Sequence, residues 1–396
     1  MLHRDAVASI VSILGAVFLA ACSSSFTLDR PLTPQPQDWL QEGGGAGRGG
    51  HVSVADDDRP ADIHHGDVLQ GDVETVGPAV NWEYSQDGAA GRAAPLFVDD
   101  AVLFFSTTGM VEMVDARSGD EIGSVSCGWF IHATPAVSNG HLFVATAGAD
   151  PLLFCFDLAG RIKRYERRFP SVHAALCAVD GGVVVVSRGG RVSFFSTEDS
   201  AAVWITELED VVAAAPAASD TLVVIAGQNG DLTACSLRDG TKRWRQPTGA
   251  AFIAGPTVRD GAIAAVNSVG TLVLAGLHDG ELRWSRSFDQ PVWQSPAWRG
   301  DTIALALSGG DVVLLHAADG RELTRYALGE LPGAAPLFAG NHILQLLRSG
   351  QLMAIDLADG GIEERARLSR RSETPVLVTS YGIVMVDEEG EAVCFR

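Results

Sequence analysis

A unit of roughly 40 residues recurs along this chain, and a fixed period of such a length indicates a repeat architecture. This repeat constrains the fold more than any other feature. Two adjacent copies are nearly identical in layout: Pro216, Gly230, Gly240 and Trp244 return with the same spacing as Pro256, Gly270, Gly280 and Trp284. A landmark proline marks seven copies, with Leu176 at its place in the third: Pro95, Pro135, Pro216, Pro256, Pro296, Pro336 and Pro375.

Short apolar runs within each unit predict β-strands. The runs at 102–105, 183–186, 303–307 and 383–386 are rich in β-branched residues and are bounded by Gly, Asp and Asn, which is typical of strands and turns. No long stretch after residue 22 shows a helical period. Four strands in every unit, without an intervening helix, match a propeller blade. The predicted fold class is therefore an all-β propeller of four-stranded antiparallel blades.

Aromatic and small residues recur at fixed places in the unit. Small residues surround the landmark prolines, as in 93–95 and 214–216, and suit inner strands that crowd around a central axis. Tryptophans recur in the last strand of the unit, where we expect them to fill the seams between blades: Trp82, Trp204, Trp244 and Trp284. Burying such a ring contributes several kcal/mol, so Trp244→Ala is expected to cost about 3–5 kcal/mol.

The number of units predicts eight blades and the way in which the ring closes. Seven units are complete, whereas the eighth, over 374–396, ends after its third strand. A strand of the missing type, containing Trp82, precedes the first unit. Pairing this strand with the last one, near Phe395, would complete an eight-bladed ring over 77–396 and leave no open sheet edge.

The N-terminal residues predict export and lipid attachment. Residues 1–21 contain Arg4, an apolar run and small residues at 20 and 21, which is typical of a signal peptide. The stretch 19–22, ending in Cys22 and followed by serines, resembles the lipobox of bacterial lipoproteins, and this resemblance implies that Cys22 is lipidated and anchored to the outer membrane. The alternative is an ordinary cleaved signal with an incidental cysteine.

Residues 22–76 are interpreted as the lipidated cysteine followed by a disordered tether. The segment has several prolines, a glycine cluster over 43–50 and an acidic run over 56–58, with few apolar residues to offset the entropy of ordering. Gly45, Gly47 and Gly50 match a dinucleotide-binding pattern, but neither a strand nor a helix flanks them, so we assign them no such role. His51, His64 and His65 are likewise interpreted as part of a solvated linker rather than as metal ligands.

Charge and cysteine content make several classes of function less favourable. With 49 acidic and 29 basic residues, the formal charge is −20, which disfavours binding to nucleic acid or to anionic head groups. The basic clusters at 161–168 and 367–371 are interpreted as solvated outer strands and loops, with a partner site as the alternative. Five cysteines follow Cys22 without CxxC or vicinal spacing. We therefore expect Cys127, Cys155, Cys177, Cys235 and Cys394 to be small buried residues rather than a disulfide scaffold.

No catalytic, cofactor-binding or metal-binding motif is present in the sequence. His132 and His173 share one place in successive repeats, so they are either a pair of ligands at the channel rim or loop histidines inherited by duplication. Asp115, Asp157 and Asp356 recur before the Gly turn, where hydrogen bonding within the turn is the expected role.

The repeat resembles that of pyrroloquinoline-quinone (PQQ) propellers, notably at 230–244 and 350–356. One branch of this superfamily, the quinoprotein dehydrogenases, implies a quinone, Ca²⁺ and a vicinal disulfide, and this chain has no adjacent cysteines. The other branch is the BamB family of lipoproteins of the outer-membrane β-barrel assembly machine. The order of signal, lipobox, tether and ring matches that family, whose members use no cofactor and dock BamA through inter-blade loops. Here the corresponding loop, 206–210, is acidic instead of basic.

The resemblance implies a non-enzymatic scaffold lipoprotein, monomeric as a ring, that faces the periplasm and holds a protein partner on its rim loops. The candidate loops are 127–133, 207–213, 247–253 and 290–295. The residues proposed for partner binding are Leu208, Asp210, Val211, Val212, Phe252, Ile253, Val292 and Trp293. Val211, Val212 and Trp293 are expected to be exposed, as apolar groups at interfaces are. The alternatives are a PQQ-dependent quinoprotein and a related lipoprotein with an unrelated ligand.

Overall fold

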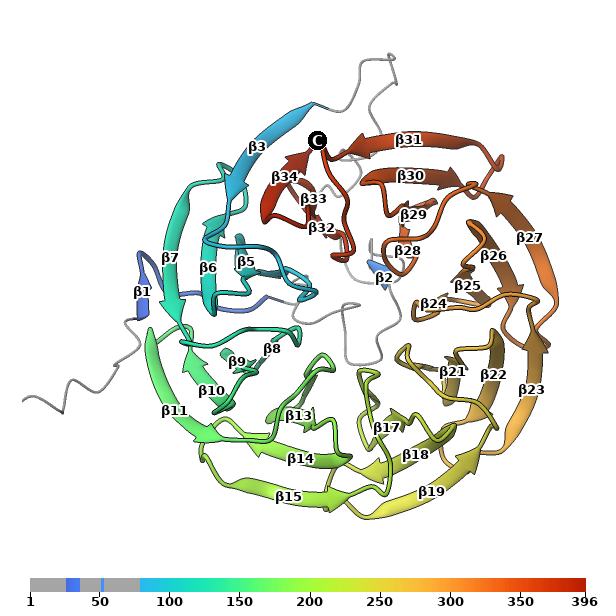
Figure 1. The fold of residues 1–396 in the computed structure, drawn as a ribbon, viewed down its shortest axis with the longest axis horizontal. Coiled ribbons are helices and arrows are strands. Elements are labelled where there is room, and N and C mark those ends of the chain that lie inside the picture. Colours follow the sequence, from blue (N-terminus) through green and yellow to red (C-terminus); the bar gives the residue numbers. More distant parts are fainter. Residues whose placement is uncertain (1–25, 36–50, 53–78) are drawn as a thin grey trace, which may run out of the picture.

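A computed structural model describes residues 26–35, 51–52 and 79–396 of the chain. Eight four-stranded antiparallel sheets surround a central axis, which confirms the predicted eight-bladed propeller (Figure 1). Within the described residues, no helix is long and apolar enough to cross a membrane. The predicted signal peptide, Cys22 and most of the predicted tether lie outside the described residues.

Each blade runs from an innermost short strand to an outermost strand at the circumference. The strands of the first four blades are β4 (Leu96–Val98), β5 (Ala101–Phe105), β6 (Met110–Asp115) and β7 (Glu121–Ser126); β8 (Ala136–Ser138), β9 (His141–Ala145), β10 (Leu152–Asp157) and β11 (Ile162–Arg168); β12 (Cys177–Val179), β13 (Gly182–Val186), β14 (Arg191–Ser196) and β15 (Ala202–Glu207); and β16 (Ala217–Ala218), β17 (Leu222–Ala226), β18 (Asp231–Ser236) and β19 (Lys242–Pro247).

The last four blades follow the same order. Their strands are β20 (Thr257–Arg259), β21 (Ala262–Val266), β22 (Thr271–Gly276) and β23 (Leu282–Ser287); β24 (Ala297–Arg299), β25 (Thr302–Ala306), β26 (Asp311–His316) and β27 (Glu322–Ala327); β28 (Leu337–Ala339), β29 (His342–Leu346), β30 (Gln351–Asp356) and β31 (Ile362–Arg367); and β32 (Leu377–Thr379), β33 (Gly382–Val386), β34 (Glu391–Phe395) and β3 (Val80–Ser85).

The N-terminal strand closes the eighth blade as predicted. β3 pairs with β34, so that Val80 is opposite Phe395 and Trp82 is opposite Cys394. The amide of Arg396 also donates to the carbonyl of Ala79 (3.0 Å). The first and last parts of the ring therefore belong to one sheet, and this sheet has no unpaired edge between them.

Two further short strands add to this ring. β1 (Phe26–Leu28) pairs antiparallel with β7 on the outside of blade 1, and β2 (His51–Val52) pairs parallel with β28 at the inner edge of blade 7. Both strands come from the segment that the sequence analysis assigns to a disordered tether. The structure therefore differs from that prediction at residues 26–35 and at the backbone of 51–52, which are ordered against the ring.

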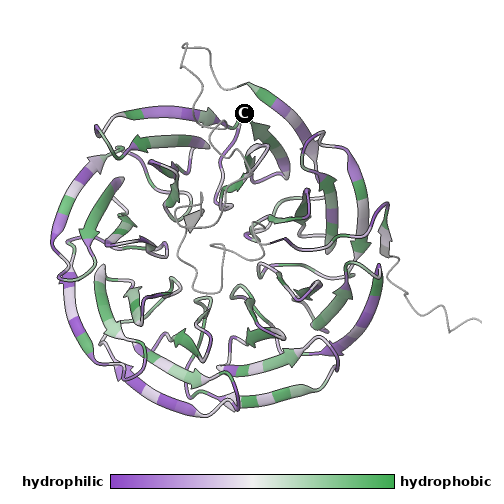
Figure 2. Ribbon diagram, turned by 180° about the vertical axis from the view of Figure 1, so that it is seen from behind, coloured by the Kyte–Doolittle hydropathy of each residue, from purple (hydrophilic) through white to green (hydrophobic). Residues whose placement is uncertain are grey.

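The core lies in the second and third strands of each blade. Every residue of β5, β13, β17, β21 and β33 is buried, because both faces of these strands pack against neighbouring blades. The outermost strands alternate between exposed and half-buried residues, and Figure 2 shows them as mixed in hydropathy around a hydrophobic interior. Continuous apolar runs thus form the buried inner strands, whereas sequences that alternate between exposed and half-buried residues form the outermost strands.

The tryptophans fill four seams between blades, as the sequence predicts. In each case the indole N–H donates to a backbone carbonyl of the next blade: Trp82 to Ala116 (2.9 Å), Trp204 to Leu237 (2.8 Å), Trp244 to Leu277 (2.9 Å) and Trp284 to Ala317 (2.9 Å). Each ring also lies on a turn glycine of the next blade, and a Cβ built on Gly280 would be 2.6 Å from the Trp244 ring. Glycine is needed there because of this contact and because its φ is +71°.

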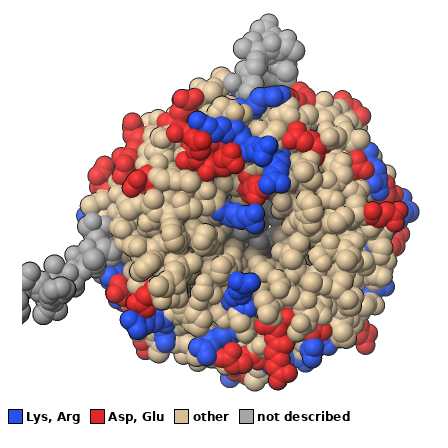
Figure 3. All heavy atoms as spheres, in the orientation of Figure 1, with Lys and Arg blue, Asp and Glu red and all other residues tan. Residues whose placement is uncertain are grey.

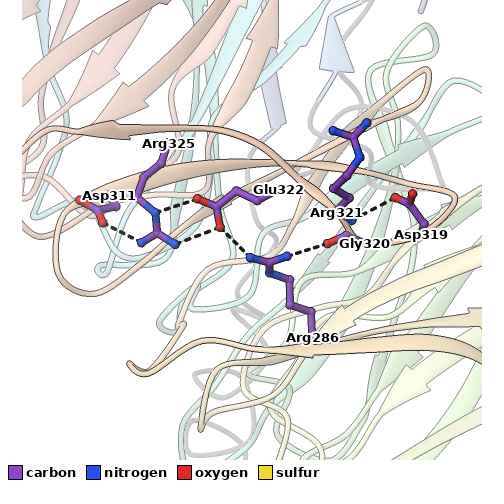
Figure 4. A network of polar contacts seen from close by, with 7 residues as sticks. All are labelled: Arg286, Asp311, Asp319, Gly320, Arg321, Glu322 and Arg325. Carbon is purple, nitrogen blue, oxygen red and sulfur yellow. Dashed lines mark hydrogen bonds and ion pairs between the residues drawn. The ribbon is translucent and has the colours of Figure 1, made fainter.

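Polar contacts reinforce one of these seams at the circumference. Arg286, two residues after Trp284, donates to the Gly320 carbonyl (3.1 Å) and pairs with Glu322 of the next blade (2.7 Å). Arg325 joins Glu322 (3.0 Å) to Asp311 (2.9 Å), and Figure 4 shows these contacts together with the hydrogen bond from the Arg321 amide to Asp319 (3.0 Å). Hydrogen bonds from Arg325 lower the pKa of Glu322, so the carboxylate remains charged within the seam.

Turn aspartates and cysteines have the structural roles that the sequence predicts. The Asp115 carboxylate accepts from the backbone amides of Arg117 and Ser118, and the Asp157 and Asp356 carboxylates accept from amides in their own turns. No disulfide joins the five cysteines within the described residues, and all five are buried. Burial raises the pKa of Cys155 to about 12 and that of Cys235 to about 11, which leaves both thiols protonated.

Candidate functional site

The segments that connect successive blades meet at one end of the central channel. Each connecting segment runs from the outermost strand of one blade to the innermost strand of the next blade. It docks on the turn between the second and third strands of that next blade. The amides of Ala147, Gln228 and Ser268, for example, donate to the carbonyls of Phe130, Val211 and Ala251. We call the face formed by these segments the loop face.

One residue from every connecting segment lines a cavity of about 480 Å³ at the channel mouth. In each segment this residue lies four places before the first residue of the next innermost strand, so its position recurs once in every blade. We call the set the mouth ring: Arg92, His132, His173, Ala213, Ile253, Trp293, Gly333 and Glu373. The repeat thus places eight residues of seven types at equivalent positions around one opening.

The mouth ring is divided into a polar half and an apolar half. Blades 8, 1, 2 and 3 contribute the four polar members, whereas the next four blades contribute Ala213, Ile253, Trp293 and Gly333. In the view of Figure 3, Lys and Arg side chains lie beside the central opening, and most Asp and Glu lie towards the circumference. The negative charge of the chain is therefore concentrated away from the axis on that face.

Ion pairs and ring stacking organise the polar half. Glu373 pairs with Arg92 (3.0 Å) and with Arg348 (2.7 Å), which also lines the cavity. His132 and His173 stack with ring centroids 6.1 Å apart. Partial desolvation of the exposed His173 ring, together with Arg188 and His132 nearby, lowers its pKa, so this ring is uncharged at neutral pH. The two histidines that share one place in the repeat are thus brought together at the channel rim.

Large exposed side chains characterise the apolar half. Trp293 is 47% exposed and Ile253 is 39% exposed, although both are large apolar residues. Leu331, which lines the same cavity, is also exposed, and Val211 is exposed in the connecting segment before Ala213. Contiguous exposed apolar groups are typical of surfaces that bind another molecule.

The structure divides the predicted partner-binding residues into two sets. Val211, Ile253 and Trp293 are exposed on the loop face, whereas Leu208, Val212, Phe252 and Val292 are buried. The expectation that Val212 is exposed is wrong, since only 1% of it is accessible. In five segments the residue before the mouth-ring position is apolar and buried, and its side chain holds the segment in place: Ile131, Val172, Val212, Phe252 and Val292.

Acidic residues at the end of blade 3 and in the connecting segment that follows it form contacts within the chain. Glu207 pairs with Arg191 (2.7 Å), and the Asp210 carboxylate accepts from the amide of Asn229 (3.0 Å) in the adjacent turn. Asp210 therefore positions this segment, and Val211 is the exposed apolar group that it presents. Sequence reasoning also missed Arg92, Arg348 and Glu373, although Arg92 and Glu373 occupy the same repeat position as His132.

The residues at the mouth do not fit the quinone and Ca²⁺ of quinoprotein dehydrogenases. Within the described part of the chain, no group of three or more His, Cys, Asp or Glu could hold a metal ion. The one carboxylate of the mouth ring, Glu373, is already paired with two arginines. We therefore derive no chemical step through such a cofactor.

The architecture and the repeat define a PQQ-like β-propeller. The family model described as outer membrane protein assembly factor BamB matches residues 107–290 and 190–396, so the chain belongs to that family. None of the curated proteins compared with this chain matches it.

Solved structures with the same fold include members of both functional branches. BamB from Moraxella catarrhalis is 18% identical, with a TM-score of 0.68, and the alignment covers 81% of this chain and 99% of that chain. Quinohemoprotein alcohol dehydrogenase from Comamonas testosteroni is 11% identical, with a TM-score of 0.73, and the alignment covers 91% of this chain and 80% of that chain. At such identities the likeness shows the fold alone, and the site must decide the function.

Proposed function

We propose that this protein is a non-enzymatic scaffold lipoprotein, anchored through Cys22 in the outer membrane and facing the periplasm. Its loop face would hold a protein partner of the β-barrel assembly machinery, as its family description implies. The observation that carries the proposal is the apolar half of the mouth ring, where Ile253 and Trp293 are exposed beside an apolar rim. Aromatic and aliphatic anchors of this kind contribute most of the energy at protein interfaces.

Site-specific crosslinking in native membranes tests the partner. A photo-crosslinking residue at Ile253 should capture subunits of the β-barrel assembly machinery. The same residue at Asp220, an exposed position between the first two strands of blade 4, should not, because the turn between those strands lies at the end of the blade opposite the connecting segments. Equal capture from both positions, or capture of no assembly subunit from Ile253, would contradict the proposal and favour a lipoprotein with another ligand.

Substitution of Cys22 tests the anchor separately. Cys22→Ser removes the only thiol that the lipobox resemblance identifies for acylation, so the protein should move from the membrane to the soluble fraction. Several acyl chains are needed for stable anchoring. Continued tight membrane association of this variant would show that lipidation of Cys22 does not hold the protein.

The quinoprotein alternative has its own readout. A quinone absorption band in protein purified from its native membranes, or Ca²⁺-dependent reduction of a dye, would favour a cofactor-dependent oxidoreductase. We expect neither, because the described residues at the mouth offer no cluster of carboxylates that could hold the ion.

A further inference from the structure

The seam between blades 1 and 2 has no aromatic residue at the tryptophan position. In β7 this position is Gly123, opposite Met113 of β6. Residues 26–35, which we call the N-terminal strap, lie there instead: β1 pairs with β7 so that Leu28 is opposite Gly123. A Cβ at Gly123 would be 2.4 Å from the Thr27 carbonyl oxygen, so glycine is what allows the strap to approach.

The strap makes the contacts that a tryptophan makes elsewhere. Leu32 is fully buried and Leu28 nearly so, within the same apolar cluster as Phe154 and Phe156 of blade 2. The amide of Leu32 donates to the carbonyl of Leu158 (3.4 Å), which corresponds to the carbonyls that accept from the indoles. An ion pair between Arg30 and Asp99 (3.0 Å) fixes the strap to blade 1. The strap is therefore a docked part of the ring.

Beside the docked strap lies a strongly basic outer strand of the propeller. β11 and the residue before it contain Arg161, Lys163, Arg164, Arg167 and Arg168 against the single acid Glu166, a net charge of +4 in a chain of −20. We call these five cations the basic strip. Arg161 donates to the carbonyl of Leu28 (3.0 Å), so strip and strap are in contact, and Figure 1 shows β1 between β7 and β11.

Part of the basic strip is available to a partner. Arg161, Arg164 and Arg168 are exposed, and Ile162 between them is 48% exposed. Arg168 pairs with Asp150 (3.0 Å) and Arg164 approaches Glu198 (4.0 Å), so acids nearby offset some of the charge. Exposed ion pairs of this kind contribute little and exchange readily for other anions.

We propose that this edge of blades 1 and 2 faces an anionic lipid bilayer, with the basic strip against the head groups. The inference rests on the proposed anchor at Cys22. Only residues 23–25 separate that cysteine from Phe26, and four steps of extended chain span at most about 14 Å. Because the strap is docked, a lipid on Cys22 holds this edge, rather than a freely rotating ring, next to the membrane. The whole chain is acidic, so the lipid on Cys22 provides the attachment, and the local basic residues at the anionic surface stabilise the orientation.

Fluorescence quenching in vesicles measures the orientation. The acylated chain, purified from membranes, is placed in vesicles of phosphatidylethanolamine, with or without phosphatidylglycerol, that carry a head-group quencher. A fluorophore is attached through Ile162→Cys or, as the matched control, through Leu282→Cys, the similarly exposed first residue of the outer strand of blade 5. We expect quenching at 162 but not at 282, and stronger quenching when phosphatidylglycerol is present.

Charge-reversal variants distinguish a local role of the basic strip from a general effect of net charge. Each cation at an anionic surface contributes about fivefold, so Arg164→Glu with Arg168→Glu should lower the ratio of membrane-facing to free orientations by roughly 25-fold or more. The same reversal at Lys242 and Arg243, on the basic outer strand of blade 4, should change it little. Equal effects of the two reversals would overturn a local role for the strip.

The remaining outcomes are distinguishable from failure of the anchor. Leu28→Ala with Leu32→Ala should free the strap, and the label at 162 should then lose its quenching while the protein still floats with vesicles. A chain that does not float with vesicles would refute the lipid anchor itself. A chain that floats but is quenched equally at 162 and 282, or equally without phosphatidylglycerol, would refute the proposed membrane-facing edge.

Discussion

Where blade 3 meets blade 4, Trp204 of the ring itself closes the seam; where blade 1 meets blade 2, the same place is occupied by Leu28 and Leu32, which come from outside the ring. The two seams bury comparable apolar groups and use equivalent backbone carbonyls. They differ in connectivity. A tryptophan in an outer strand cannot leave its seam without disrupting a blade, whereas the strap can detach at its own local free energy. The seam between blades 1 and 2 is thus closed by a segment that can detach from the ring, although its packing is equivalent to that of a tryptophan.

The largest contrast should come from removing a tryptophan. Trp204→Ala deletes a buried ring and its hydrogen bond to Leu237, and should lower the free energy of unfolding by about 3–5 kcal/mol, measured by urea denaturation. Trp293→Ala, at an exposed tryptophan of the mouth ring, is the control and should change it little. A cost below about 1 kcal/mol for Trp204→Ala would mean that the indole does not hold the seam.

Substitutions at two glycines should give the next largest difference in stability between the two kinds of seam. Gly280→Ala places a methyl group against Trp244 in a backbone with φ of +71°, and such overpacking should cost about 1–3 kcal/mol. Gly123→Ala instead collides with the strap, which can move away. We expect normal urea unfolding of the ring for Gly123→Ala, together with rapid proteolysis within 26–35. A large loss of ring stability for Gly123→Ala would contradict the idea that the strap is separable.

A smaller effect on global stability is expected from shortening Leu32, the buried side chain that holds the strap against the ring. Leu→Ala at a fully buried site usually costs about 2–5 kcal/mol, as it should at Leu352 in the ring core. At Leu32 the strap detaches before that cost is reached, so global stability should fall by less than about 1 kcal/mol. Hydrogen exchange should reveal the change, because the Asp29 amide, bonded to the Ile122 carbonyl, would lose protection. If Leu32→Ala destabilises the ring as much as Leu352→Ala, the strap is integral to it.

Repetition is what made the ring predictable from sequence. The fixed period indicated the number of blades, and the displaced strand around Trp82 indicated the closure that β3 and β34 make. The turn role of Asp115 followed from its recurrence in several units. Each of these features is read from comparison between copies, and no single copy would have been sufficient.

The features missed from sequence depend on single residues that vary between copies or on how the loops fold against the ring. Glycine in place of tryptophan at 123 was the signal for the strap, but a composition rich in Pro and Gly at 31–50 favoured disorder. Val212 was expected to be exposed because a loop has no regular alternation to predict which side chain points inward. The pairing of Arg92, Arg348 and Glu373 depends on ring geometry that joins the first connecting segment to the last.

The smallest contrast concerns the seam between blades 2 and 3, which is closed by Tyr165 outside and by the His132–His173 stack at the channel mouth. Partial desolvation and the nearby Arg188 lower the pKa of His173, so the folded state binds this proton less readily than the unfolded state. Stability from this group is therefore complete above the ordinary histidine pKa near 6.5 and is lost as the pH falls below it.

Because His173 is partly solvated, the effect should be about 0.5 kcal/mol or less between about pH 7 and pH 5. His173→Gln should remove this part of the pH dependence, as followed by urea midpoints across that range, while His141→Gln, at a histidine outside the mouth ring, should retain it. An unchanged slope in the His173 variant would show that acid weakens another seam. The channel mouth would then be no more sensitive to acid than the circumference.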